Sequence, residues 1–209
     1  MEIMLDVSPR RLAEKSKQFD FEFWQLRTPL TRNSIANVPY GLDNGCFKRF
    51  NQKTWERMLD DCFEQKMPKF ACLPDIVGNA QRTIELFHEF ELRTNGIPRA
   101  LVLQDGINNI TINWSKISAV FVGGTDAFKI SPEVFETCKA AKMLGKWIHV
   151  GRVNTIQRLA HWIDIADSID GSGISKYDHM LQEVVDFIKG NHQFDKNMNL
   201  FLGSDHATT

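Results

Sequence analysis

Carboxylates and a carboxamide stand at the ends of several apolar runs in the sequence. Asp43, Asp75 and Asp170 each follow a short apolar stretch, and Gln104 ends the run 101–103. If these runs are parallel strands of one sheet, all of their tips meet at one end, where an active site is expected. Two carboxylates in one site suit a reaction in which one attacks the substrate and the other transfers a proton. Taken singly, each residue also suits a turn or a helix cap, so only their joint placement indicates a site.

The elements that must position these residues are short apolar runs alternating with amphipathic helices. The predicted strands number seven or eight and cover residues 2–7, 21–26, 40–44, 69–77, 99–105, 119–124, 146–151 and 168–170. The predicted helices cover residues 8–15, 51–65, 79–95, 131–144, 154–163 and 177–189. Such alternation forms right-handed βαβ units and a parallel sheet. It predicts a compact α/β protein, a single-domain (β/α)8 barrel of the TIM type over residues 1–209, with an open doubly wound sheet as the alternative. Leu200-Phe201-Leu202 is a further candidate strand.

The charge, the glycine motifs and the cysteine spacing limit which partners and cofactors we expect for the protein. The net charge of −1 over 209 residues gives no global basic field of the kind that marks many nucleic-acid-binding proteins. The glycines at 123–124 and 171–173 complete no nucleotide-binding motif, so we expect no cofactor. Four cysteines stand far apart, which predicts neither a zinc site nor disulfides; they are Cys46, Cys62, Cys72 and Cys138. With no signal peptide or membrane-spanning segment in the sequence, we expect a cytoplasmic protein.

In order along the chain, the strand tips resemble those of the tRNA-guanine transglycosylase family. The resemblance is strongest to the small phage-type DNA 7-deazaguanine transglycosylases related to it. The matching pieces are Asp43-Asn44-Gly45-Cys46-Phe47, Pro74-Asp75, Gln104 with Gly106, Gly123-Gly124, His149-Val150-Gly151 and Ile169-Asp170. The resemblance implies a queuosine-related glycosyltransferase that modifies DNA, replacing guanine by a 7-deazaguanine of the preQ0 type. For a phage-encoded protein the compartment would be the host cytoplasm.

The resemblance also implies roles for individual residues. Asp170 would be the nucleophile that forms a glycosyl-enzyme intermediate, and Asp43 the general acid and base. The residues expected to hold the base are Phe47, Asp75, Gln104, Gly123, Gly124 and Val150, with Phe47 and Val150 on its two faces. The candidates for phosphate contacts are Lys48, Arg152 and Lys176. No metal is expected, because the zinc-binding cysteines and histidine of the tRNA enzymes have no counterpart.

The expected partners are therefore DNA, favoured over tRNA, and a free 7-deazaguanine base. A homodimer or a partner subunit would enlarge the small basic surface. Three other interpretations stay open. One is the same exchange on tRNA. The second is a metal-dependent barrel hydrolase that uses Asp43, Asp75, His149 and Asp170, and the third is a non-catalytic subunit.

Overall fold

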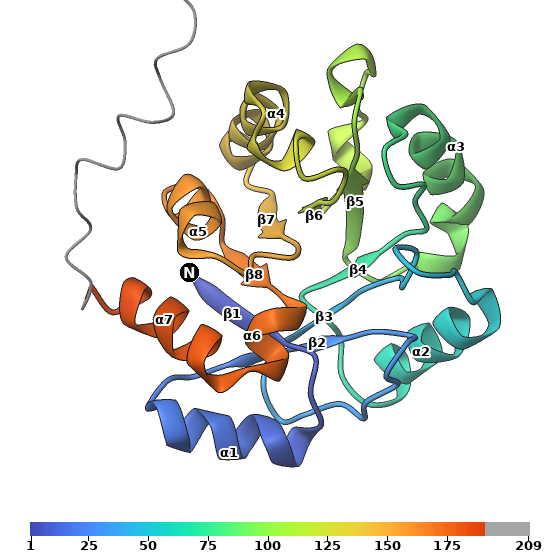
Figure 1. Ribbon diagram of the computed structural model, residues 1–209. Coiled ribbons are helices and arrows are strands. Elements are labelled where there is room, and N and C mark those ends of the chain that lie inside the picture. Colours follow the sequence, from blue (N-terminus) through green and yellow to red (C-terminus); the bar gives the residue numbers. More distant parts are fainter. Residues whose placement is uncertain (191–209) are drawn as a thin grey trace, which may run out of the picture.

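Short apolar strands close into a barrel with helices packed around it, as Figure 1 shows for the computed structural model of the protein. The structure describes residues 1–190. The strands are β1 (Glu2–Leu5), β2 (Trp24–Arg27), β3 (Tyr40–Leu42), β4 (Phe70–Cys72), β5 (Arg99–Leu103), β6 (Ala119–Val122), β7 (Trp147–Val150) and β8 (Ser168–Asp170). Each strand pairs in parallel with its neighbour in sequence, and β8 closes the ring by pairing with β1. The predicted (β/α)8 barrel is confirmed, and the open sheet is wrong.

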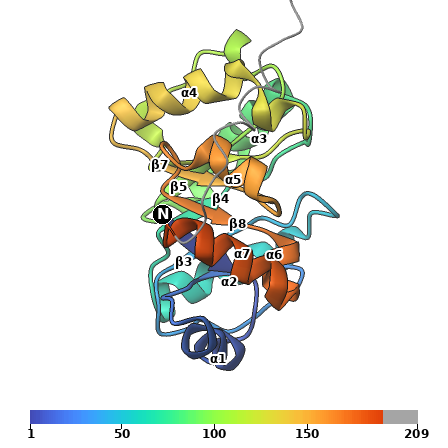
Figure 2. The same ribbon diagram turned by 60° about the vertical axis from the view of Figure 1, so that its left-hand side comes forward.

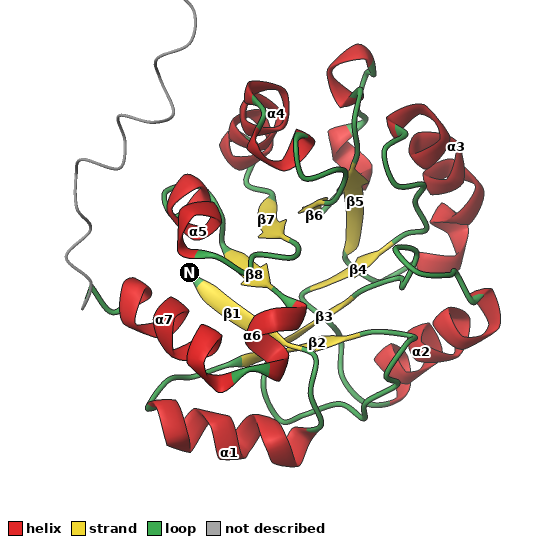
Figure 3. Ribbon diagram, viewed as in Figure 1, coloured by secondary structure: helices red, strands yellow, loops and turns green. Residues whose placement is uncertain are grey.

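Helices follow most of the strands and form the outer layer (Figure 3). They are α1 (Pro9–Phe19), α2 (Gln52–Glu64), α3 (Ala80–Phe90), α4 (Pro132–Met143), α5 (Ile156–Trp162), α6 (Ser172–Lys176) and α7 (Asp178–Ile188). Four short 3-10 segments join them: η1 (Glu91–Thr94), η2 (Ile107–Asn109), η3 (Trp114–Lys116) and η4 (Phe128–Ile130). Five of the helices begin at a side-chain cap, contributed by Ser8, Asn51, Asn79, Ser131 and Thr155. None of the described helices has the length and apolarity that a membrane span needs.

The structure departs from the predicted elements mainly at their ends. The strands are shorter than predicted, because the residues around their tips form loops rather than sheet pairings. Residues 172–176 form the short helix α6, although the glycines at 171 and 173 favour a turn. The helix ends at its C-terminal cap, Tyr177. The candidate strand at Leu200-Phe201-Leu202 lies outside the described residues.

Side chains along each strand alternate between two apolar layers. The inner layer fills the barrel and comprises Met4, Leu26, Phe70, Cys72, Ala100, Val102 and Ala119, with Trp24, Phe121 and Trp147 packed against it. The larger outer layer lies between strands and helices, where residues such as Ile148 and Val150 are fully buried. Figure 2 shows the helices lying against the outside of the barrel. Whether a residue has an odd or an even position along its strand therefore decides whether its side chain faces the barrel interior or the helices.

Two contacts tie distant parts of the barrel together. At the amino end, the indoles of Trp24 and Trp147, on β2 and β7, stack with ring centroids 5.5 Å apart and planes 12° apart. On the outside, the buried Lys15 of α1 donates to the Asp178 carboxylate of α7 at 2.6 Å. The second contact joins the first helix of the barrel to the last.

Candidate active site

A cavity of about 430 Å³ opens at the carboxyl ends of the strands, where barrel enzymes carry their active sites. Most of the residues selected from the sequence line it: Asp43, Phe47, Lys48, Asp75, Gln104, Gly123, Gly124, Arg152 and Asp170. Apolar side chains of Leu26, Val102 and Phe121 complete its wall. The cavity thus combines an apolar wall with convergent polar groups, the usual composition of a small-molecule site.

Asp43 directly follows β3 and is half-buried at the cavity. Its Oδ1 accepts a hydrogen bond from the backbone N–H of Asn44 at 2.8 Å. Burial, followed by the negative charges of Asp170 and Asp75, raises the pKa of Asp43 to about 7. A carboxyl with this pKa holds a proton in part of the molecules at neutral pH, so it suits both halves of general acid–base catalysis.

Asp170 ends β8 and belongs to a chain of buried hydrogen bonds. Its Oδ2 lies 2.9 Å from Nε2 of His149, whose Nδ1 lies 2.8 Å from Oγ of Ser168. Trp147 donates its indole N–H to that same Oγ at 2.8 Å. Since the indole only donates and an ionised carboxylate only accepts, Ser168 donates to Nδ1 and His149 donates from Nε2 to Asp170. The chain orients the Asp170 carboxylate toward the cavity.

Asp75 is held from both sides by amides. Its Oδ1 accepts from Nδ2 of Asn44 at 2.7 Å, and its Oδ2 accepts from Nε2 of Gln104 at 2.6 Å. Burial raises the pKa of Asp75, although these hydrogen bonds act in the opposite direction. Gln104 also accepts from the backbone N–H of Gly78 at 2.8 Å, so both ends of its amide are engaged within the protein. Asp75 and Gln104 therefore form one structural unit at the wall rather than two independent substrate contacts.

The two glycines that follow β6 leave room for the side chains packed around them in the cavity wall. A Cβ on Gly123 would lie 2.7 Å from Cγ1 of Val102 and 2.8 Å from Nε2 of Gln104. Gly124 has a φ of 76°, and a Cβ there would lie 2.4 Å from the ring of Phe128. Larger residues would displace the Gln104 amide or the 3-10 segment that follows.

Phe47 and Arg152 meet at the mouth of the cavity. The Phe47 ring is 57% exposed, and the Arg152 guanidinium carbon lies 4.1 Å from its centroid. Arg152 has a φ of 63°, in the left-handed region, and its backbone N–H donates to Oδ1 of Asp170 at 3.2 Å. The loops after β3 and β7 thus join through a cation–π contact that covers part of the entrance.

Two of the selected residues lie elsewhere. Val150 is fully buried in the outer layer between strands and helices, because its neighbour His149 takes the inward-facing position on β7. It does not line the cavity, and the prediction that it covers a ligand face is wrong. Lys176 ends α6 as an exposed residue outside the cavity lining, with its Nζ 5.1 Å from the ring centroid of Tyr177.

Lys129 lines the cavity but was not selected from the sequence. It lies in η4, between the two glycines and α4. From the sequence alone, a lysine at such a position is expected to be exposed to solvent. The structure instead buries it to 1% exposure. Asn44, which holds Asp75, was likewise missed, because Asp43-Asn44-Gly45 has the composition of an ordinary turn.

Within residues 1–190, no three or more His, Cys, Asp or Glu side chains are grouped so as to hold a metal ion. All four cysteines are free thiols. Burial raises the pKa of Cys46 to about 12, so the one cysteine in contact with Asp75 stays protonated at neutral pH.

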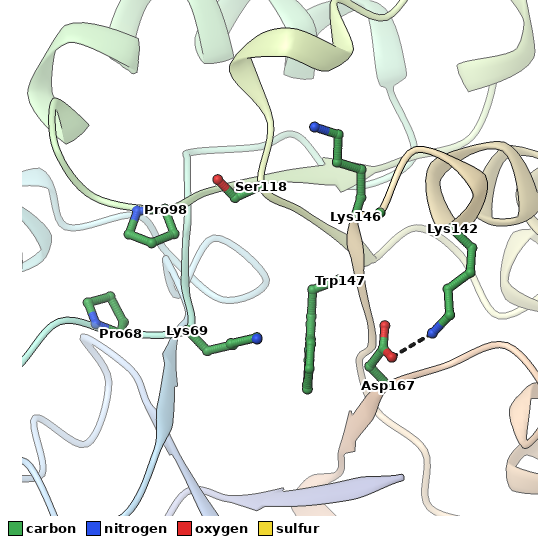
Figure 4. Close-up of a pocket in the computed structure, with 9 residues that line it drawn as sticks. Pro68, Lys69, Pro98, Ser118, Lys142, Lys146, Trp147 and Asp167 are labelled. Atoms are coloured by element: carbon green, nitrogen blue, oxygen red, sulfur yellow. Dashed lines mark hydrogen bonds and ion pairs between the residues drawn. The ribbon is translucent and has the colours of Figure 1, made fainter.

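A second cavity of about 510 Å³ lies at the opposite, amino end of the barrel (Figure 4). Lys69 points into it, with its Nζ 4.0 Å from the Trp147 ring centroid, and Lys142 is paired with Asp167 at 2.5 Å. In barrels of this type the amino end serves stability rather than chemistry.

Comparison with known proteins identifies the fold. No family model matches the chain, and no curated protein matches it. Among solved structures, it is similar to an HpcH/HpaI aldolase from Desulfitobacterium hafniense DCB-2, at 11% sequence identity with a TM-score of 0.52. The match covers 93% of each chain. At this identity the likeness shows a shared barrel fold.

The comparison contradicts the base-exchange function expected from the sequence. The solved barrel is described as an aldolase, which is a different reaction class from a pentosyltransferase. Polar residues and glycines at strand tips are general properties of barrel active sites. The same order of such residues along the chain therefore occurs in barrels that catalyse different reactions. The transglycosylase interpretation of the cavity is therefore corrected.

Proposed function

We propose that the protein is an enzyme of the lyase type, which breaks or forms a carbon–carbon bond in a small carbonyl compound. The observation that carries the proposal is the Asp43 carboxyl, which has a pKa of about 7 and shares the cavity with Asp170, the carboxylate that the buried His149 holds by a hydrogen bond. The aldolase description of the similar barrel supports this reaction class.

The reaction requires proton transfer at two positions of the substrate. In the cleavage direction, ionised Asp43 takes the proton of a hydroxyl on the carbon β to the carbonyl. The bond between the α and β carbons then breaks, its electron pair moves toward the carbonyl, and the β carbon leaves as an aldehyde or ketone. The remaining α carbon takes a proton from a protonated carboxyl. Asp43 suits both proton transfers because its pKa lies near neutral pH, so the carboxyl can both take up and release a proton.

The positive groups of the cavity suit an anionic substrate. Arg152 stands at the mouth, and Lys129 lies deeper in the lining. A cation near the developing negative charge stabilises it, and Arg152 is suited to bind a carboxylate of the substrate. We therefore expect small hydroxy-oxo acids, or the oxo acid and aldehyde that they yield, among the substrates.

Exchange of α-protons with solvent tests this proposal without knowledge of the full substrate. Purified protein is incubated with small oxo acids in deuterium oxide, and loss of the α-proton signal is followed by proton nuclear magnetic resonance. We expect catalysed exchange, reduced about 10²-fold or more in Asp43→Asn. Asp60→Asn, an exposed change on α2, should leave the rate unaltered. Exchange no faster than in buffer for every oxo acid, with folded protein, would refute the proposal.

A further inference from the structure

Lys129 is buried in the cavity lining without a carboxylate partner. Its side chain is 1% exposed, and its Nζ donates to the backbone carbonyl of Gly151 at 2.6 Å. Among the described residues, no Asp or Glu oxygen lies within 4.0 Å of this nitrogen, whereas the other buried lysine, Lys15, is paired with Asp178. A buried, unpaired ammonium is costly, and such a lysine loses its proton more easily than an exposed one.

Burial favours the neutral amine. It lowers the pKa of Lys129 to about 8; the charges of Asp170 and Asp126 oppose this effect, and those of Arg152 and Arg158 reinforce it. A neutral amine carries the lone pair that an ammonium lacks, so it can act as a nucleophile. Lys48, which also lines the cavity, is exposed and provides a comparison within the same site.

We propose that Nζ of Lys129 attacks the carbonyl carbon of the substrate and holds it as a Schiff base. The inference rests on the proposed function and specifies its substrate as a free aldehyde or ketone, including oxo acids. The amine adds to the carbonyl to give a carbinolamine, which takes up a proton and loses water to give a protonated imine. Asp43 and Asp170 line the same cavity and are the candidate proton-transfer groups, with His149 hydrogen-bonded to Asp170 behind the wall.

The imine then accepts the electrons of the bond that breaks. In the cleavage direction, Asp43 takes the proton of the β-hydroxyl, the β carbon leaves as an aldehyde or ketone, and the electron pair of the broken carbon–carbon bond moves onto the protonated imine to form a neutral enamine. The α carbon of the enamine takes that proton back from Asp43, which restores the protonated imine, and water then hydrolyses it to the free amine, the carbonyl product and a proton. No electrons leave the system, and water is lost once and regained once.

Borohydride trapping tests the covalent step directly. Wild-type protein is incubated with pyruvate or with glycolaldehyde, reduced with sodium borohydride, and examined by intact mass spectrometry and peptide mapping. We expect one adduct per chain, placed on Lys129, that requires both the carbonyl compound and the reductant. The rate of trapping should rise as the pH increases toward about 8, because the neutral amine becomes more abundant.

Variants separate the covalent role from a purely structural one. Lys129→Arg keeps a donor for the Gly151 carbonyl but forms no stable imine, so the adduct should be lost while the fold is retained. Lys17→Met, at an exposed lysine of α1 outside the cavity lining, should keep the adduct. No adduct in wild-type protein, or adducts spread over exposed lysines, would overturn the inference.

The two proposals fail in different ways. Catalysed α-proton exchange without an adduct on Lys129 would leave the lyase proposal standing and refute the Schiff base. An adduct on Lys129 without exchange or bond cleavage for any oxo acid would support the covalent site and refute the lyase activity.

Discussion

At the scale of single residues, the carboxylates of the cavity set its chemistry. Burial acts most on the pKa of Asp43, and the negative charges of Asp170 and Asp75 add to its effect. His149 and the amides of Asn44 and Gln104 stabilise those two neighbours. Hydrogen bonds from backbone N–H groups lower the pKa of Asp43, but they do not cancel the effect of burial and of the two charges.

The raised pKa of Asp43 predicts a pH-dependent stability. Its pKa is about 7 in the folded protein, against an ordinary value of 3.8. Between these values the folded chain binds a proton that the unfolded chain has lost, so this group makes stability fall as pH rises from about 4 to about 7. Asp43→Asn removes the effect. Relative to wild type, the variant should gain about 2 to 3 kcal/mol in unfolding free energy from pH 5 to pH 8.

Urea denaturation at the two pH values measures this gain. Asp60→Asn, on the exposed face of α2, is the matched control and should show no such change. An equal difference between Asp43→Asn and wild type at pH 5 and pH 8 would contradict the raised pKa.

Sequence reasoning located the carboxylates of the site but not their partners. Asp43, Asp75 and Asp170 were found because each ends an apolar run, and a parallel barrel brings such ends together. Val150 was misplaced because its orientation depends on strand parity, which the sequence around His149-Val150-Gly151 does not reveal. Lys129 was missed because its burial arises from the packing of η4 against β7 and α5, and neither contact is local in sequence.

At the scale of elements, loops after neighbouring strands are joined by side-chain amides. Asn44, in the loop after β3, donates to the Leu73 carbonyl at 2.6 Å and to Asp75 at 2.7 Å beyond β4. Its Oδ1 accepts from the backbone N–H of Cys46 at 2.8 Å. One side chain therefore holds the position of both loops at the cavity wall.

Asn44→Asp should disrupt this junction although the side chain keeps its shape. A carboxylate cannot donate to Asp75 or to the Leu73 carbonyl, and it places a second negative charge beside Asp75. We expect a loss of about 3 to 5 kcal/mol in unfolding free energy at pH 8, compared with about 1 to 3 for Asn44→Ala. Thermal and urea unfolding of the two variants would measure the difference. Asn109→Asp, an exposed change in η2, should be nearly neutral; equal losses for Asn44→Asp and Asn44→Ala would contradict the charge argument.

At the scale of the whole molecule, closure of the barrel joins the first elements to the last. Backbone pairing links β1 to β8, and Lys15 links α1 to α7 outside that seam. The alternation of strands and helices was enough to predict this closed topology from the sequence. The contacts across the seam were not predicted, because Lys15 and Asp178 are 163 positions apart.

Lys15→Met should weaken the seam while keeping most of the buried aliphatic stem. The ammonium donates to Asp178 at 2.6 Å, and without it that carboxylate retains, among residues 1–190, only Gln18 as a side-chain donor. We expect a loss of about 1 to 3 kcal/mol in unfolding free energy, measured by urea denaturation with far-ultraviolet circular dichroism. The control is Lys17→Met, an exposed residue on the same helix. A loss no larger than that of the control would show that the ion pair contributes little to closure.

The stacked indoles of Trp24 and Trp147 give the protein an optical property of its own. Two indoles whose centroids lie 5.5 Å apart are close enough for their electronic transitions to couple, so we expect the pair to contribute a band of its own to the circular dichroism spectrum. The pair lies on β2 and β7 at the end of the barrel opposite the cavity. Separation of the two strands should abolish this band. The molecule therefore carries an internal spectroscopic reporter of barrel integrity at the end opposite the cavity.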